Sequence, residues 1–497
     1  MKNIPSSASF FTMALALFYL AGCAVALLVL RTIFQILRSS TARVPGPWYT
    51  RYTSLVLDFH FLTATRTSYV HGLHQLYGPV VRLGPNEVAV SDIGAVKTVY
   101  STKETFRKSD FYKRIVSAGT ESLFSTVDVD FHRRHRRLLG GPMSETSLKN
   151  LAPQVEARVD LAIGRIAEEM KERGTADVYK WWLFMATDII GELTFGDSFR
   201  MLELGQKNAY ARELERVNRV SALRSTFPNI VRFSGIVPLP VFRRAFEAST
   251  NMRRYAGDSL SRYRRLIDEN PNLPQETLFT KLFRAEADEK LPFHEILSEA
   301  QSYIVAGSDT TANTLTYLTW SVCRRPDIRA KLVDELRALP PDFGEADLHA
   351  LPYLNHVIDE TLRLYSAAPS GLPRVVPPGG AHLAGYRLDG GTIVSTQAYS
   401  MHRDPIVFPS PDSFIPERWA EPTKEMKDAF MPFGRGPRVC IGQHLARMEL
   451  RLASARFFHA FPEAHISSLE GMSDEDMKPR IHFLLTPSGG RCLVQAR

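Results

Sequence analysis

Helical patterning of apolar and polar positions extends over most of this chain. Apolar residues recur at helical spacing in seven stretches, which predict helices over residues 63–77, 130–139, 148–173, 181–195, 293–323, 353–365 and 443–461. Gly174 and Gly196 directly follow two of these stretches, and glycine commonly ends a helix. The pattern therefore predicts a mainly α-helical chain.

Strand patterning is confined to short stretches. Residues 79–90 alternate, with valine or leucine at 80, 81, 83, 88 and 90, and predict two strands around a turn at residues 84–86. Residues 385–388 and 392–394 predict a hairpin around the Asp-Gly pair between them. We therefore expect small β-sheets beside the helices.

The N-terminal stretch is apolar over a length that suits a membrane. Residues 4–30 carry no charge, and the nearly continuous apolar run over residues 10–30 would span roughly 31 Å as a helix. Three arginines follow the run, at positions 31, 38 and 43, whereas only Lys2 precedes it. This asymmetry places the remainder of the chain on the cytoplasmic side. We expect a membrane anchor with its basic flank at residues 1–43 and one large domain at residues 44–497.

Two other interpretations of the N-terminus are weaker. A cleaved signal peptide would have a shorter apolar run and would carry its positive charge before that run. The segment Leu-Ala-Gly-Cys at residues 20–23 is similar to a bacterial lipoprotein cleavage site, but apolar residues continue to Leu30. The Pro-Gly-Pro sequence at residues 45–47 prevents the anchor helix from continuing into the domain.

Composition and charge narrow the class of protein. A length of 497 residues suggests about three domains, yet no linker divides the chain, and 44% hydrophobic residues suffice for one large core. The net charge of +8 is spread along the chain, with its densest patch at residues 133–137, so no nucleic-acid partner is expected. The four cysteines show no paired spacing, which argues against a disulfide framework.

Candidate chemistry centres on the loop at residues 433–442, Phe-Gly-Arg-Gly-Pro-Arg-Val-Cys-Ile-Gly. Its cysteine, Cys440, precedes a predicted helix, and Arg438 lies two residues away. Backbone N–H groups at a helix start and a nearby cation stabilise a thiolate, which is the form that binds metals. A lone cysteine is more often buried and inert, so this loop needs support from other motifs.

A second candidate lies within the helix predicted over residues 293–323. Its centre reads Ala-Gly-Ser-Asp-Thr-Thr at residues 306–311, where glycine costs about 1 kcal/mol relative to alanine. Serine and threonine bind nearby carbonyl groups and can bend or open the helix. Asp309 and Thr310 form an acid–alcohol pair suited to proton delivery. The alternative is a kinked core helix in which Asp309 makes a structural salt bridge.

The spacing of the loop resembles the haem-binding loop of the cytochrome P450 family, in which five positions match Phe433, Gly436, Arg438, Cys440 and Gly442. The resemblance covers residues 44–497 and implies one mainly helical P450 domain of the microsomal class. It implies that Cys440 is the axial thiolate ligand of the iron in haem b. The stretch at residues 373–380 is similar to fungal secondary-metabolism members.

The resemblance also assigns roles to the other motifs. Ala306 would lie in an opened helical turn that makes room for dioxygen, Thr310 would hydrogen-bond the dioxygen, and Asp309 would relay protons. Glu360 and Arg363 match a Glu-x-x-Arg motif, and Arg418 matches its downstream partner; together they would fix the cysteine loop through buried ion pairs.

Four basic side chains would bind the haem propionates according to the resemblance. Arg374 and Arg438 match the family's arginines at these places. Arg136 lies four residues after His132, where many members have tryptophan and arginine at this spacing. The missing tryptophan makes His132 the weaker assignment, and a surface histidine is the alternative.

The implied function is a monooxygenase on the endoplasmic reticulum membrane, anchored by a single span. It would insert one oxygen atom into a hydrophobic small molecule, such as a polyketide, terpenoid or alkaloid, bordered by residues 366–372 and 481–488. No dinucleotide fingerprint is present, so electrons would come from NADPH through a separate NADPH–cytochrome P450 reductase, which residues 133–137 and Arg435 could contact. The alternatives are a reductase-independent isomerase or dehydratase of the same fold, and a non-catalytic membrane haem-binding protein.

Overall fold

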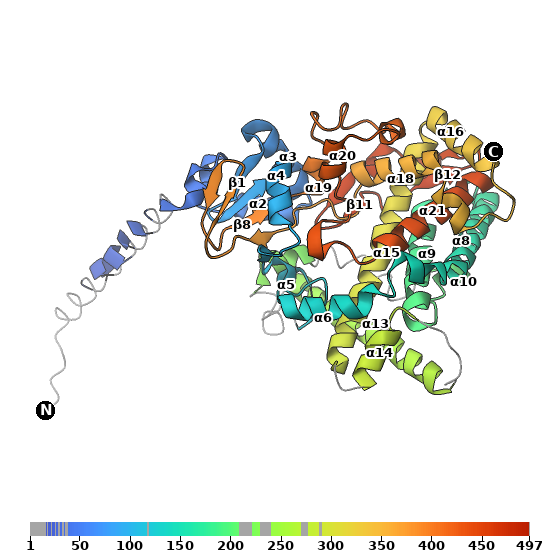
Figure 1. Cartoon of the computed structure of the whole chain (residues 1–497), viewed down its shortest axis with the longest axis horizontal. Helices are drawn as coiled ribbons and strands as arrows, with labels where there is room; N and C mark the ends of the chain where they lie inside the picture. The colour runs from blue at the N-terminus through green and yellow to red at the C-terminus, as the bar shows by residue number, and fades with distance from the viewer. Residues whose placement is uncertain are drawn as a thin grey trace.

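The computed structural model describes residues 38–116, 119–207, 221–228, 240–269, 277–287 and 291–496, with scattered positions between 16 and 34. The described part is mainly helical with small sheets, as the pattern predicted (Figure 1). The predicted apolar anchor over residues 10–30 falls largely outside the described residues. Within the described part of the chain, no helix is both long enough and apolar enough to span a bilayer.

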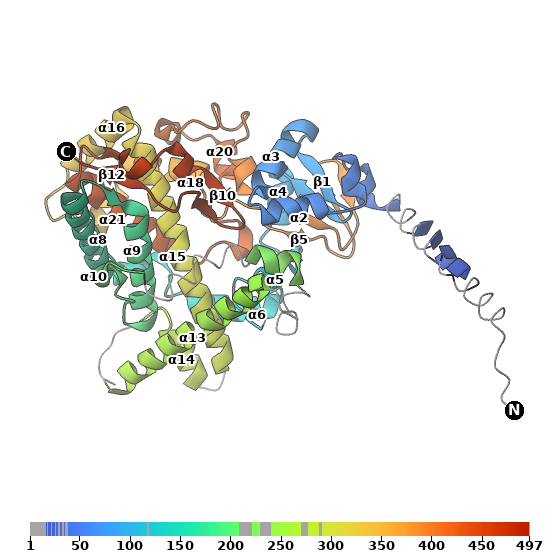
Figure 2. The ribbon, with the colours of Figure 1, turned by 180° about the vertical axis from the view of Figure 1, so that it is seen from behind.

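The longest helix, α15 (Phe293–Cys323), runs through the centre of the molecule (Figures 1 and 2). It packs against α9 (Val178–Phe195), α18 (Pro352–Leu364) and α21 (Gln443–Ala460), and α8 (Ala152–Arg173) covers α9 and α21. Nearly every side chain of α9 is buried. The main hydrophobic core therefore surrounds the C-terminal half of α15.

Shorter helices complete the described fold. Their bounds are α2 (Leu55–Leu62), α3 (Arg66–Tyr77), α4 (Ile93–Val99), α5 (Phe111–Ile115), α6 (Val129–Gly140), α7 (Glu145–Lys149), α10 (Met201–Leu204), α13 (Pro240–Glu269), α14 (Thr280–Ala287), α16 (Pro326–Arg337), α17 (Glu345–His349), α19 (Ala398–Met401) and α20 (Lys424–Ala429). Figure 2 shows α13 and α14 at the lower end of α15.

The largest sheet has five strands in the order β1 (Val80–Gly84), β2 (Glu87–Val90), β8 (Ile393–Ser395), β5 (Arg374–Val375) and β3 (Arg107–Lys108). It lies with α2, α3 and α4 at the end of the molecule where the described chain begins (Figure 1). The smaller sheets pair β6 (Ala381–Leu383) with β7 (Tyr386–Leu388), β10 (Pro479–Ile481) with β11 (Leu485–Pro487), and β12 (Leu493–Gln495) with β4 (Ala176–Asp177) and β9 (His465–Ile466).

The predicted hairpin between residues 385–388 and 392–394 is wrong. Strand β7 pairs instead with the preceding β6, and β8 pairs with β2 and β5. The tight turn that joins β6 to β7 contains Ala384 and Gly385, both at positive φ, a geometry that favours a two-residue hairpin. The Asp-Gly pair instead leads the chain from this small hairpin into the large sheet.

Most helix predictions are confirmed, and the exceptions have local causes. The helix predicted over residues 293–323 has those bounds. The stretch predicted over residues 148–173 instead contains the end of α7 and all of α8, because Pro153 is suited to the first turn of a new helix. Gly174 and Gly196 end their helices with φ of 73° and 71°, as the sequence predicted.

Candidate functional site

The cysteine loop folds tightly before α21. The backbone N–H of Cys440 donates to the carbonyl oxygen of Phe433 at 2.9 Å, which closes the loop. Gly436 has φ of 72°, and a Cβ there would lie 2.2 Å from the carbonyl oxygen of Tyr100. Glycine is therefore required at this position by the protein itself. Gly442 differs, because a Cβ there would meet no atom within 4 Å.

The thiol of Cys440 is surrounded by many protein atoms, although part of the residue's surface remains accessible to solvent. Burial raises its pKa, while the N–H of Gly442 and the charge of Arg136 act in the opposite direction. Arg136 also donates from Nη1 to the carbonyl oxygen of Val439 at 2.7 Å. The cation beside the thiol is therefore Arg136, from α6, and not Arg438 as the sequence suggested. A bound metal ion would deprotonate such a thiol outright.

Helix α15 faces this loop. Burial and the charge of Glu299 raise the pKa of the Tyr303 phenol. The thiolate charge of Cys440 adds to this rise, so Tyr303 lies close to Cys440. One turn later, Ala306 is exposed although most of the surrounding helix is buried. Exposed surface on Ala306 and on Cys440 marks two facing elements between which a flat group would fit.

The Ala-Gly-Ser-Asp-Thr-Thr motif does not interrupt α15. The hydroxyl of Thr310 donates to the carbonyl oxygen of Ala306 at 2.7 Å, and the helix continues through the motif. A Cβ on Gly307 would lie 2.7 Å from Cγ1 of Ile190, so glycine allows α9 to approach closely. The expected opened turn is therefore absent, and the glycine serves helix packing. Asp309, beside Thr310, is buried.

Glu449 is a buried acid that the sequence analysis missed. It lies on α21, is fully enclosed, and hydrogen-bonds Thr311 of the α15 motif. Burial raises the pKa of Glu449 to about 8, so its carboxyl group is mostly protonated at neutral pH. The sequence showed only that Glu449 lies nine residues after Cys440 on a predicted helix. Helical spacing alone does not reveal its contact with Thr311.

A buried basic cluster lies beside the loop and consists of Lys108, His132, Arg374 and Arg438. Arg438 pairs with Glu104 and donates to the carbonyl oxygen of Thr126 at 3.1 Å. These contacts turn Arg438 away from the thiol, which explains why Arg136 lies beside it instead.

Positive charge exceeds negative charge within this basic cluster. Burial, Arg374 and Arg438 together hold the pKa of Lys108 well below its usual value, and Glu104 only partly opposes them. Burial and the neighbouring cations lower the pKa of His132 to about 3, so His132 is neutral. Nδ1 of His132 has no hydrogen-bond partner among the described residues. Such a site favours a ligand that carries carboxylates.

Arg374 is anchored among aromatic side chains. Its Nη1 donates to the Tyr112 hydroxyl at 3.0 Å and to the carbonyl oxygen of Pro373 at 3.1 Å. Its guanidinium also lies 5.0 Å from the centre of the Tyr100 ring. These contacts hold Arg374 on β5, between β8 and β3 of the large sheet, without supplying a carboxylate partner.

The ion network of Glu360, Arg363 and Arg418 is present. Glu360 accepts two hydrogen bonds from Arg363, at 2.8 and 2.9 Å, and one from Arg418 at 3.0 Å. Trp419 and the backbone of Ile415 also donate to the same carboxylate, each at 2.9 Å. The network ties α18 to the segment that precedes the cysteine loop.

The residues present fit a haem. Cys440 supplies a metal-binding sulfur, Ala306 and Gly442 leave space on the facing elements, and the basic cluster complements two carboxylates. Arg136 contacts the loop at Val439, and its charge contributes to the lowered pKa of His132 in the basic cluster. The sequence-predicted cofactor residues thus lie on or around the cysteine loop. The Glu360 network instead holds the segment that precedes this loop.

Comparison with known proteins gives an independent result. The family model described as Cytochrome P450 matches residues 45–494. The cytochrome P450 monooxygenase tazI of Aspergillus terreus is 48% identical over 469 residues, which cover 94% of this chain and 96% of the relative.

Two further relatives are also fungal. The cytochrome P450 monooxygenase orf2 of Aspergillus niger is 42% identical over 96% of this chain and 97% of its own length. The cytochrome P450 monooxygenase stcB of Emericella nidulans is 34% identical over 91% of this chain and 87% of its own length.

Proposed function

We propose a substrate class, an electron route and a cellular location for a chain that belongs to the cytochrome P450 family and is a monooxygenase. The proposed substrate is a hydrophobic intermediate of fungal secondary metabolism, such as a polyketide, terpenoid or alkaloid. The observation that carries the proposal is the Cys440 thiol, which faces Ala306 of α15 beside the basic cluster.

The site residues divide the work between binding and proton supply. When bound, haem supplies the oxidising chemistry. Cys440 would hold the iron, while Arg374, Arg438 and His132 would hold the carboxylates. The Thr310 hydroxyl, beside exposed Ala306, can hydrogen-bond dioxygen after leaving the Ala306 carbonyl. Buried Asp309 would supply protons to it.

A cluster of aromatic rings supports an apolar substrate. The ring of Phe483 lies 5.7 Å from that of Phe124 and 6.2 Å from that of Phe111, between ring centres. The carbonyl oxygen of Phe124 accepts a hydrogen bond from Lys108, so this cluster adjoins the basic cluster. Rings in this position offer a large apolar surface to a substrate near the haem.

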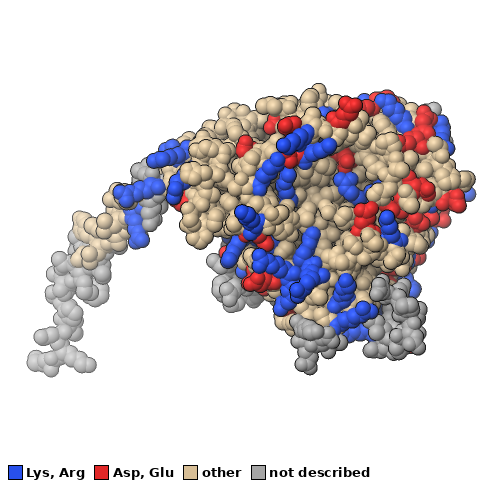
Figure 3. Space-filling model, viewed as in Figure 1, with Lys and Arg blue, Asp and Glu red and all other residues tan. Residues whose placement is uncertain are grey.

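The proposed electron donor is a separate NADPH–cytochrome P450 reductase. Basic side chains gather over α6 on the face shown in Figure 3, where Arg133 and Arg137 are exposed. On the opposite side of the same helix, His132 and His135 are buried. An acidic reductase surface would complement the exposed arginines and bring electrons to the side where Arg136 contacts the loop.

The proposed location is the endoplasmic reticulum membrane, with the domain facing the cytoplasm. The uncharged N-terminal segment and the arginines that follow it support this placement. Trp48, Leu55 and Phe59 are also exposed near the start of the domain, where they can contact lipid. Fractionation of cells expressing the full chain should recover it with microsomes, and removal of residues 1–38 should release a substantial share.

The central test is spectroscopic. Reduced protein exposed to carbon monoxide should show the red-shifted absorption band of thiolate-bound haem, and Cys440→Ser should lose it. Persistence of the band in the variant, or its absence from the wild type, would refute the proposed site. Metabolite profiles of a fungal host with and without the chain would then identify the substrate by the precursor that accumulates.

The electron route has a separate test. The double variant Arg133→Glu/Arg137→Glu should slow reduction by the reductase several-fold and weaken the salt dependence of the rate. The control Lys171→Glu/Arg337→Glu changes the same charge on α8 and α16. Equal rates for the two variants would reject α6 as the docking surface, and product formation without NADPH would reject the need for a reductase.

A further inference from the structure

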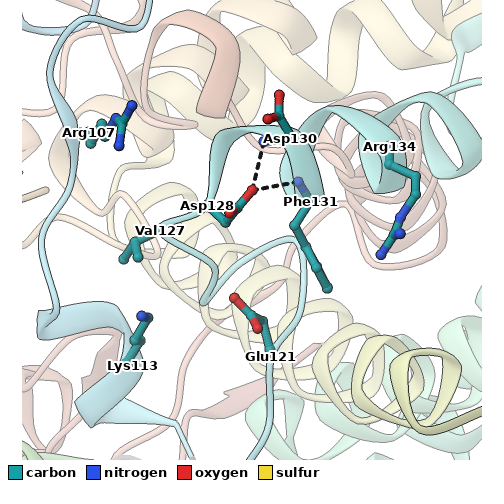
Figure 4. A pocket seen from close by; sticks show the side chains of 8 residues that line it. All are labelled: Arg107, Lys113, Glu121, Val127, Asp128, Asp130, Phe131 and Arg134. Carbon is teal, nitrogen blue, oxygen red and sulfur yellow. Dashed lines mark hydrogen bonds between the residues drawn. The ribbon is translucent and has the colours of Figure 1, made fainter. Parts of the chain in front are cut away.

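An open cavity lies where α5, α6 and the segment before α6 meet. Figure 4 shows Lys113, Glu121, Phe131 and Arg134 around it. A second cavity, of about 400 Å³, shares Lys113, Glu121 and Phe131 and also reaches Glu295 at the start of α15. Solvent in this cavity can therefore reach a carboxylate on the helix that carries the Asp-Thr pair.

Glu295 is the first of three titratable groups that lead inward from the cavity. Its Oε2 lies 2.8 Å from Nε2 of His135, which is fully buried on α6. Nδ1 of the same imidazole lies 2.7 Å from Oε1 of Glu299, which is also fully buried. Phe131 stacks on His135 with ring centres 3.9 Å apart and holds the imidazole between the carboxylates. A histidine bonded through both nitrogens can accept a proton on one side and release one on the other.

The inner end of this arrangement has unused hydrogen-bonding capacity. Oε2 of Glu299 and the hydroxyl of Tyr303 are buried and have no partner among the described residues. Glu299 and Tyr303 are four residues apart, so they lie on one face of α15, and Tyr303 is within electrostatic reach of Cys440. Ala306 and Thr310 continue that face toward the reaction site.

Glu299 has one structural contact, because its Oε1 also accepts a hydrogen bond from the backbone N–H of Leu123 at 2.7 Å, but its other oxygen has no partner among the described residues. Arg134 and His135 both bind Glu295, at 2.7 and 2.8 Å, and this pairing alone would fasten α6 to α15. Glu299 adds a buried carboxyl group with an unsatisfied oxygen, which costs free energy. Burial raises the pKa of Glu299, and the bond to His135 opposes the rise.

We propose that Glu295, His135 and Glu299 form a second proton path, which carries protons from the surface cavity along α15 toward Tyr303 and the reaction site. Protonated Glu295 gives its proton to Nε2 of His135, and His135 releases the proton on Nδ1 to Glu299. The imidazole ends in its other neutral tautomer and is reset by a flip of the ring, after Glu299 has passed its proton inward. No electrons move, and the protons come from water and are consumed when dioxygen is reduced.

Several charged groups surround His135. Glu295 and Glu299 face the imidazole from α15, and Arg134 adds positive charge from its own helix. Across the second cavity, Lys113, Glu121 and His294 face Glu295. Arg136 faces Tyr303 at the inner end. A titration of activity would report all of these groups, so the test uses single substitutions instead.

The test compares Glu299→Gln with Arg134→Gln in the full-length, haem-loaded enzyme. Glutamine keeps the shape and hydrogen-bonding ability of Glu299 but cannot carry its proton. Arg134→Gln removes the ion pair with Glu295, so it loosens the same contact between α6 and α15 but keeps all three groups of the path. Substrate-free NADPH oxidation with a purified reductase is measured together with the hydrogen peroxide released, since two-electron-reduced oxygen leaves as peroxide when protons arrive too slowly.

The path predicts a specific pattern. Glu299→Gln should raise the fraction of NADPH electrons found in hydrogen peroxide at least twofold and enlarge the solvent deuterium isotope effect, while Arg134→Gln should change both less. The infrared spectrum of the oxidised enzyme should lose one D2O-sensitive carboxylic acid band in Glu299→Gln only. Equal peroxide fractions in wild type and Glu299→Gln would overturn the path, as would equal changes in both variants, which would indicate a clamp.

The inference rests on the proposed monooxygenase site, and the two can fail separately. A wild-type protein without the carbon monoxide band would refute the site. A wild type with that band and normal electron flow, but with no effect of Glu299→Gln on peroxide or on the infrared spectrum, would refute the path alone.

Discussion

Arg363 and Arg374 are both buried arginines, but their surroundings differ. Arg363 is fully enclosed and bonded to both oxygens of Glu360, and it also donates to the carbonyl oxygens of His402 and Ser413. Arg374 contacts a hydroxyl, carbonyl oxygens and aromatic rings, and its charged neighbours include the cations Lys108 and Arg438.

This difference separates a structural ion network from a binding site. In the Glu360 network both arginines pair directly with one carboxylate of the protein itself, so the network specifies how α18 meets the segment before the cysteine loop. In the basic cluster the protein gathers like charges in a buried place and leaves them only partly compensated. Such an arrangement lowers stability unless a ligand supplies the missing negative charge.

The largest expected effect comes from breaking the compensated network. Glu360→Gln would leave Arg363 and Arg418 buried without a carboxylate, which should lower the free energy of unfolding by about 3–5 kcal/mol. Denaturant titration of purified protein measures this change. Asp412→Asn is the matched control, because Asp412 pairs with buried Arg403 at 3.2 Å but is itself 83% exposed. The control should lose less than about 1 kcal/mol; equal losses would contradict the comparison.

Two glycines of the loop, Gly436 and Gly442, separate a glycine that protein packing requires from one that only a ligand would require. Gly436→Ala should lower the free energy of unfolding by roughly 1–3 kcal/mol, because of its positive φ and the contact with the Tyr100 carbonyl. Gly442→Ala should change it by less than about 0.5 kcal/mol, since its φ is −86° and the space beside it is free.

The Gly442 variant also tests the cofactor. If its unfolding is unchanged, a fall in haem absorbance per protein identifies the ligand, and not protein packing, as the reason for glycine. Wild-type haem content in Gly442→Ala would show that nothing packs against this position.

Acid pH should weaken both regions through one buried histidine in each. Burial lowers the pKa values of His132, in the basic cluster, and of His402, beside Arg363, to about 3. The unfolded chain binds protons at these histidines near pH 6.5, whereas the folded chain does not. Stability is therefore present above pH 6.5 and is lost as the pH falls toward 3, by up to about 1.4 kcal/mol per pH unit for each histidine.

Unfolding midpoints measured from pH 7.5 to 4.5 check this slope. His132→Gln should reduce the slope of stability against pH by the contribution of one of the two histidines. A slope unchanged in that variant would mean that His132 does not titrate as the structure indicates.

A small effect on stability is also expected at Lys108. Lys108→Gln removes one of the crowded cations, and the relief of repulsion offsets the lost hydrogen bond to the Phe124 carbonyl. The free energy of unfolding should change by less than about 1 kcal/mol, while the haem retained after gel filtration should decrease. A loss of stability as large as that of Glu360→Gln would show that Lys108 acts as a structural anchor, as the Glu360 network does.

Local rules recovered much of the architecture and fewer of the contacts. The bounds of α15, the glycine ends of α8 and α9, and the loop around Cys440 follow from residues close in sequence. The hairpin prediction failed because strand partners come from distant segments: β8 joins β2 and β5 in the large sheet.

Long-range packing also changed the roles of single residues. Arg136 lies beside the thiol because Arg438 is engaged by Glu104, 334 residues away in sequence. Gly307 is needed for contact with Ile190, and Glu449 reaches Thr311 from another helix. Periodicity within one helix carries no information about such partners.

The sequence by itself determined the order of the helices and the places of the loop cysteine and of the acid–alcohol pair, because helix formation and tight turns depend on neighbours within a few residues. Only the tertiary structure decided which charges are compensated, which glycines are required by packing, and that His135 lies between two carboxylates. Those outcomes depend on burial and on distances between segments far apart in the chain, and burial is what converts an ordinary charge into a structural anchor or a binding site.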